Sequence, residues 1–234
     1  MLEFKEASRR DVRIKMALGG KSGAGKTLSA LLIAKGLVEN VAKVGVLQTE
    51  AGRAQCYLRD IGTFKVLDMA PPFSPMKYIE GIEIAEKSKL EVLVIDSISD
   101  EWAGPGGALD MHSAACEVTK NTFTAWKNVT PKHDQFMNRI LQSPLHIICT
   151  VRKKTETILE TVERNGRTIQ VPKRVGLKDI QRDDSEYRWI VQFDLEQEGN
   201  LATVIKDNTK LFQGKPAFLI NVETGKKLRD WCLT

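Results

Sequence analysis

The chain has 234 residues, of which 42% are hydrophobic and 28% are charged, and this composition excludes a disordered or fibrous protein. Its apolar runs are too short to cross a bilayer and its N-terminus lacks the pattern of a secretion signal, so we expect a cytoplasmic location and no membrane partner. The formal net charge of +5 fits an anionic partner without identifying one. Four cysteines and three histidines are scattered along the chain and predict neither a zinc site nor a redox motif.

A glycine-rich segment at residues 20–27 is the first informative stretch. It fits the phosphate-binding pattern G-x-x-x-x-G-K-T, between an alternating apolar run (12–18) and a run with helical spacing (27–38). Free backbone N–H groups and a helix N-terminus suit phosphate oxygens. Lys26 is predicted to reach the β- and γ-phosphates, and the Thr27 hydroxyl to bind Mg²⁺. The predicted nucleotide-binding residues of this loop are Gly20, Lys21, Ser22, Gly23, Ala24, Gly25, Lys26 and Thr27.

Strand-like and helix-like segments then alternate along the chain. We expect strands over 44–50, 64–69, 90–97 and 145–151, with helices over 78–89, around 108–125 and over 131–142. This alternation predicts a parallel sheet with right-handed crossovers and flanking helices.

The run 90–97 is the most apolar, so it is expected to be a central strand. Asp96 stands at its carboxyl end, where a carboxylate can hold Mg²⁺. The alternative is that Asp96 only caps the following segment.

A basic excursion covers residues 152–182, which hold nine Lys or Arg and four Asp or Glu. Its central part, 157–171, is predicted to form a hairpin on the Asn165-Gly166 turn. Two interpretations stay open: a solvated charged face, or a surface that contacts a phosphate backbone. The candidate nucleic-acid residues are Lys153, Lys154, Arg164, Arg167, Lys173 and Arg174. Trp102 and Trp126 could provide a stacking surface for bases, although tryptophan is more often a core residue.

The ends of the chain complete the expected organisation. Residues 1–11 are predicted to be a strand or an arm, and residues 186–222 an antiparallel extension of the sheet at one edge. A second domain is then unnecessary, and residues 1–234 are expected to form a single domain.

Four segments resemble the RecA-like ATPases, most nearly the small phage-encoded RecA-like proteins described as nucleotide-binding or single-strand-annealing recombination proteins. They are the loop at 20–27, Ile95-Asp96-Ser97, Gln48-Thr49-Glu50-Ala51-Gly52 and Val204-Ile205-Lys206-Asp207-Asn208. The resemblance implies an α/β fold with a RecA-like P-loop NTPase core: a central, mostly parallel sheet flanked by helices and extended by antiparallel C-terminal strands.

The same resemblance implies roles for further residues. Glu50 would activate the attacking water, and Lys206 would reach the γ-phosphate bound by a neighbouring subunit. Thr150 falls at the polar sensor position, where the family usually has glutamine, so the resemblance also implies that Thr150 binds the nucleotide. Asn208 stands where a second basic residue is usual, with Lys210 as its potential substitute. The region after Arg152 corresponds in order to a DNA-binding loop.

The expected function is that of an ATPase using ATP and Mg²⁺, which binds single-stranded DNA and assembles head to tail as a filament or ring. Such a protein would serve phage-type recombination or annealing in the host bacterial cytoplasm, with a single-strand-binding protein or another recombination partner. Two alternatives stay open: a P-loop kinase, and a nucleotide-gated binding module with negligible hydrolysis.

Overall fold

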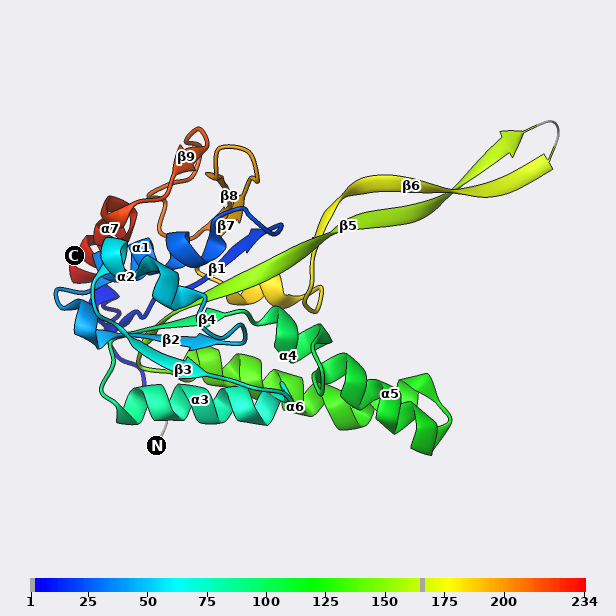
Figure 1. The fold of residues 1–234 in the computed structure, drawn as a ribbon, viewed down its shortest axis with the longest axis horizontal. Helices are drawn as coiled ribbons and strands as arrows, with labels where there is room; N and C mark the ends of the chain where they lie inside the picture. The colour runs from blue at the N-terminus through cyan, green and yellow to red at the C-terminus, as the bar shows by residue number, and fades with distance from the viewer. Residues whose placement is uncertain (1–2, 165–166) are drawn as a thin grey trace.

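The computed structural model describes residues 3–164 and 167–234, so the predicted Asn165-Gly166 turn lies outside it. The fold is built on a nine-stranded sheet with the order β3-β2-β4-β5-β1-β7-β8-β9, and β6 pairs with β5 (Figure 1). The strands are β1 (Lys15–Gly20), β2 (Val44–Gln48), β3 (Lys65–Asp68), β4 (Val92–Asp96), β5 (His146–Arg164), β6 (Arg167–Asp179), β7 (Val191–Leu195), β8 (Leu201–Asp207) and β9 (Phe218–Leu219).

Helices cover both faces of this sheet. They are α1 (Lys26–Leu37), α2 (Leu58–Ile61), α3 (Pro75–Lys87), α4 (Ser99–Ala103), α5 (Ala108–Thr119), α6 (Thr122–Gln142) and α7 (Val222–Leu233). Apolar residues of α1 and α7 pack in one core cluster, and those of α3 and α6 pack in a second. Among the described residues, no helix combines the length and apolar character needed for a bilayer crossing.

The central strands confirm the predicted α/β architecture. Strand β4 lies between β2 and β5, all pairs from β3 to β7 along the sheet order are parallel, and every residue of β1, β2 and β4 is buried. A strand covered on both faces needs apolar residues throughout. This explains the apolar run Val92–Ile95 and confirms the central strand predicted over 90–97.

The helical region differs from the prediction at Pro131. The expected break there is wrong, because α6 continues through Pro131 and instead begins at the side-chain cap Asn121, whose Oδ1 accepts the Thr124 N–H at 3.0 Å. Proline costs one backbone hydrogen bond inside a helix. The buried stripe of Val129, His133 and Phe136 continues across it, so tertiary packing offsets that cost.

The C-terminal part also differs in detail. Strands β8 and β9 are antiparallel to their neighbours, as expected, but β7 pairs with β1 in parallel. The sequence prediction also missed α7. This helix packs on α1 through a close glycine contact, in which a Cβ on Gly225 would lie 2.1 Å from the Ile33 carbonyl oxygen. The N-terminal segment is an arm and not a strand, and its short 3₁₀ turn at Arg9–Asp11 contacts α7.

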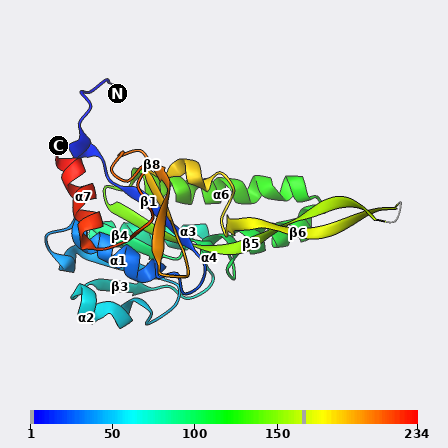
Figure 2. The same cartoon turned by 90° about the horizontal axis from the view of Figure 1, so that it is seen from above.

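A long hairpin projects from the body of the molecule (Figures 1 and 2). Its strands pair antiparallel from Lys153 opposite Asp179 to Arg164 opposite Arg167, with an irregularity between Glu156 and Thr157. The predicted hairpin is therefore confirmed, and it is longer than expected. Strand β5 belongs to both the central sheet and the hairpin, since it begins between β4 and β1 and continues outward into the hairpin.

Candidate functional site

The loop between β1 and α1 has the backbone shape of a phosphate-binding loop. Gly23 and Gly25 have φ angles of +80° and +78°, a region that favours glycine. Gly25 precedes the first turn of α1, and this helix end has no side-chain cap. Its N–H groups are therefore in the usual position to bind an anion.

Lys26 folds back over this loop. Its Nζ donates to the carbonyl oxygens of Gly20 at 2.9 Å and Lys21 at 2.8 Å. Burial lowers the pKa of Lys26, although the negative charge of Asp96 acts in the opposite direction. A bound phosphate would take the place of the two carbonyls as the hydrogen-bond acceptor of Lys26, and its charge would make that interaction stronger.

The Asp96 carboxylate is held by two threonine hydroxyls. Thr27 Oγ1 donates to Oδ2 at 2.6 Å, and Thr150 Oγ1 donates to Oδ1 at 2.5 Å. Thr150 is fully buried on β5. It thus reaches the site through Asp96, which differs from the direct nucleotide contact that the sequence predicts.

Thr27 and Asp96 fit a Mg²⁺ site. Their hydroxyl and carboxylate oxygens touch, and oxygen donors of this kind are the ones that Mg²⁺ prefers. Within the described residues, no group of three or more His, Cys, Asp or Glu side chains could hold a metal. This is expected if phosphate oxygens and water complete the coordination.

Glu50 lies beside the loop but not on a strand. Strand β2 ends at Gln48, and Glu50 stands in the following turn with 46% of its side chain exposed. Its Oε2 is 2.8 Å from Arg53 Nη2. The role of Glu50 as catalytic base stays a prediction, and the ion pair through Oε2 leaves Oε1 as the oxygen that could orient a water.

These groups converge on one cavity of about 600 Å³. Lys26, Thr27, Glu50 and Asp96 all line it, which brings together the predicted centre of the site. The sequence prediction missed further lining residues that come from distant segments: Arg53, Tyr57, Arg152, Ile180 and Asn200. Asn200 contacts the loop directly, since its Nδ2 donates to the Gly23 carbonyl at 3.1 Å.

Lys153 also borders this cavity, and its surroundings correct the prediction of an exposed, DNA-contacting side chain. Its Nζ lies 2.7 Å from Asp194 Oδ2 and 3.2 Å from Asp179 Oδ1, with only 10% of the side chain exposed. Burial by itself would lower the pKa of Lys153, but the hydrogen bonds and charges of the two carboxylates raise it. The reason is strand alternation, which turns Lys153 toward β7.

The other predicted residues are dispersed. Lys154 is exposed, and Lys173 Nζ is 2.7 Å from Glu160 Oε1 on the hairpin surface. Lys206 Nζ donates to the carbonyls of Glu186 and Tyr187 at 3.2 and 3.1 Å, and does not line the cavity of its own chain. The side chains of Arg164, Arg167 and Arg174 lie outside the described part of the chain.

A family model described as an AAA domain matches residues 13–183. The chain belongs to this family. The matched range contains the phosphate-binding loop, Asp96 and the whole hairpin. Among curated proteins, none matches the chain. As an AAA-domain protein the chain is a P-loop ATPase, and nucleotide binding with Mg²⁺ is typical of that class.

Proposed function

We propose that this AAA-domain protein is a RecA-like ATPase that binds single-stranded DNA through its hairpin, assembles head to tail and serves phage-type recombination or annealing. The observation that supports it is the course of β5. This strand runs unbroken from the nucleotide site, where Thr150 holds Asp96, into the projecting hairpin. A change at one end of a continuous strand can therefore act on the other.

Hydrolysis in this proposal follows from the residues around the cavity. Lys26 and the loop amides stabilise negative charge on the transferring phosphoryl group. Thr27 and Asp96 would hold Mg²⁺, which would supply neutralisation of phosphate charge. Glu50 orients the attacking water. Each of these interactions is stronger in the transition state than with bound ATP, and this difference accelerates the reaction.

A second subunit completes the site in this proposal. Lys206 lies on the partly exposed face of β8, beside a surface hollow of about 600 Å³ that also includes Asn208 and Lys210. In a head-to-tail interface, unlike surfaces of two copies meet. Lys206 of one copy would then approach the phosphates bound by the next, and hydrolysis would depend on assembly.

ATP turnover tests the catalytic assignment. We expect Lys26→Ala and Glu50→Gln each to lower kcat by at least about 100-fold, because each removes charge stabilisation or water orientation. Lys87→Ala, an exposed change on α3, is the matched control and should leave turnover unchanged. Unchanged turnover in Glu50→Gln would show that another group positions the water.

The half-exposed Glu50–Arg53 pair favours one competing function, a nucleotide-gated binding module with negligible hydrolysis. That function predicts tight ATP binding with no turnover, with or without single-stranded DNA. Stimulation of turnover by single-stranded DNA supports the ATPase proposal instead.

The salt dependence of DNA binding tests the hairpin. Lys154 and Lys173 are exposed on it, so the variant Lys154→Ala/Lys173→Ala should bind single-stranded DNA more weakly. Its slope of log K against log salt should fall by about 0.7 for each lost phosphate contact. The control is Lys87→Ala/Lys227→Ala, on helices α3 and α7. Identical slopes for wild type and hairpin variant would exclude phosphate contacts by these lysines.

A further inference from the structure

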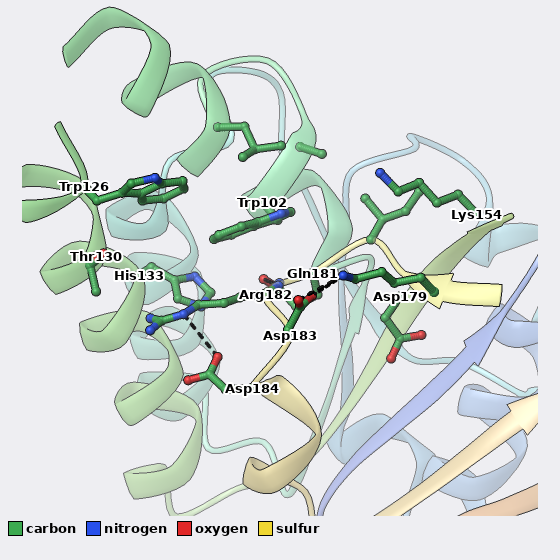
Figure 3. Close-up of a pocket in the computed structure, with 14 residues that line it drawn as sticks. Trp102, Trp126, Thr130, His133, Lys154, Asp179, Gln181, Arg182, Asp183 and Asp184 are labelled. Atoms are coloured by element: carbon green, nitrogen blue, oxygen red, sulfur yellow. Dashed lines mark hydrogen bonds and ion pairs between the residues drawn. The ribbon is translucent and has the colours of Figure 1, made fainter. Parts of the chain in front are cut away.

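A second cleft, separate from the nucleotide cavity, opens between the helices α4 and α6 and the base of the hairpin (Figure 3). Its volume is about 610 Å³, enough for a molecule of nucleotide size. Its lining combines tryptophans from the helices with lysines from β5 and β6. The ATPase mechanism described above uses none of these side chains.

One wall of the cleft is aromatic. Trp102 on α4 and Trp126 on α6 are half-buried, with ring centroids 5.8 Å apart and planes inclined by 13°. His112 stacks on Trp126 at 4.0 Å, and His133 meets Trp102 edge-on at 5.2 Å. These contacts cover part of each indole, and both indoles keep some exposed area that lines the cleft.

The support behind this wall is polar and buried. His133 Nδ1 lies 3.0 Å from Oε1 of Glu101, which has no solvent exposure. Gln181, at the end of the hairpin, donates to the Ile98 carbonyl at 3.2 Å and so joins the hairpin to the α4 side of the cleft. The aromatic wall is therefore fixed to the hairpin base.

The opposite wall carries charges of both signs, because Lys154, Lys178 and Arg182 line it together with Asp179, Asp183 and Asp184. Lys154 and Lys178 are directly opposite each other in the β5–β6 ladder, so both project from the same face. Lys178 Nζ is 2.8 Å from Asp183 Oδ1, whereas Lys154 makes no ion pair with any described residue. The adjacent Lys153 lies on the other face, toward β7 and the nucleotide cavity, and its ion-pair partner Asp179 also lines the present cleft.

From this combination we propose that the cleft binds one nucleotide unit of a single strand: its base stacks on the Trp102–Trp126 pair, and its backbone phosphate pairs with Lys154. The flat face of a base can stack on the indoles, and a phosphate can form an ion pair with a lysine that lacks a partner among the described side chains. A base is accessible in this way only when it is unpaired. The inference rests on the proposed single-stranded DNA binding and adds a base-binding position to it.

Binding of two oligonucleotides of equal length and charge tests the cleft: oligo(dT) and the corresponding abasic oligodeoxynucleotide. The wild-type protein should bind oligo(dT) about 10-fold more tightly, because only that strand has bases to stack. Trp126→Ala should bind oligo(dT) as weakly as the abasic strand, and Trp126→Phe should recover part of the difference. Abasic binding should not change in either variant.

The matched control is Trp231→Phe, on α7 and far from the cleft, which should keep the full preference for oligo(dT). Equal wild-type affinity for both strands would refute the base-stacking site while leaving backbone binding by the hairpin intact. No binding of either strand would refute the proposed DNA function itself. The wild-type comparison requires no substitution, so it stays decisive even if Trp126→Ala fails to fold.

Discussion

Asp96 receives hydrogen bonds from two threonines that come from different elements, Thr27 on α1 and Thr150 on β5. This makes Thr150 a positioning residue for the Mg²⁺ ligand. Groups that orient a metal ligand without touching the metal commonly change metal affinity by about 10- to 100-fold when they are lost.

Thr150→Val tests this role. The substitution keeps the branched shape and removes the hydroxyl, so we expect the Mg²⁺ concentration for half-maximal ATP turnover to rise by about 10-fold. Thr150→Ser keeps the hydroxyl and should remain close to wild type. A rise in the KM for ATP at saturating Mg²⁺ would instead support the direct nucleotide contact that the sequence predicts.

His146, at the start of β5, should make stability depend on pH. Its Nδ1 accepts the Ile14 N–H at 3.0 Å, and burial, with the charges of Arg13 and Lys15, lowers its pKa to about 4. The unfolded chain, with a histidine pKa near 6.5, then binds the proton more tightly. The contribution of neutral His146 to the free energy of unfolding is therefore fully present above about pH 6.5. It is lost as the pH falls toward 4.

Urea unfolding at pH 7.5 and 5.0 measures this effect. From pH 7.5 to pH 5.0 the free energy of unfolding of the wild type should fall by about 2 kcal/mol more than that of His146→Asn. His112→Asn is the control on α5. Lys15, with a pKa lowered to about 8 by burial, titrates mainly above this interval and is present in both proteins, so its small contribution cancels in the comparison. Equal losses in wild type and His146→Asn would contradict the assignment.

At the scale of elements, the contact between α1 and α7 ties the phosphate-binding loop to the C-terminus. A Cβ on Gly36 would lie 2.1 Å from the Val222 carbonyl oxygen, and one on Gly225 equally close to the Ile33 carbonyl. The two backbones therefore approach at a distance that only glycine permits.

Gly225→Ala should separate these helices. We expect the free energy of unfolding to fall by about 1–3 kcal/mol, the usual cost of overpacking a tight core. Lys227→Ala, on the exposed face of α7, tests substitution in the same helix without the close contact and should have little effect. Chemical unfolding of both variants measures this difference. If Gly225→Ala has the same free energy of unfolding as the wild type, the α1–α7 contact is not rigid.

The two faces of strand β5 have different surroundings at the hairpin base. Lys153 points to Asp194 and the nucleotide cavity, and Lys154 to the tryptophan cleft. Adjacent residues of a strand always take opposite faces. For this reason one basic run in the sequence, Arg152-Lys153-Lys154, serves two different surroundings.

At the scale of the whole molecule, the proposed assembly predicts complementation between inactive variants. Lys26→Ala retains Lys206, and Lys206→Ala retains a complete phosphate-binding loop. If Lys206 acts on the neighbouring subunit, equal mixing should restore about a quarter of the wild-type turnover, since a quarter of random head-to-tail interfaces hold both lysines. Each variant alone should be inactive.

Mixing before addition of ATP and single-stranded DNA, followed by a turnover assay, measures this recovery. A mixture of Lys26→Ala with Lys26→Ala/Lys206→Ala is the control and should stay inactive. Full turnover by Lys206→Ala alone would show that Lys206 has no role in hydrolysis. If both single variants and their mixture are inactive, Lys206 does not act on the neighbouring site.

The sequence by itself determined the phosphate-binding loop, the central strand ending in Asp96 and the hairpin, because glycine spacing, apolar runs and basic composition are local patterns. Only the tertiary structure decided which distant groups meet there. Asn200 reaches the loop, Thr150 reaches Asp96, and Lys153 turns away from solvent. The order of the strands and the alternation of side chains set these contacts, and packing also carried α6 through Pro131 against its local preference.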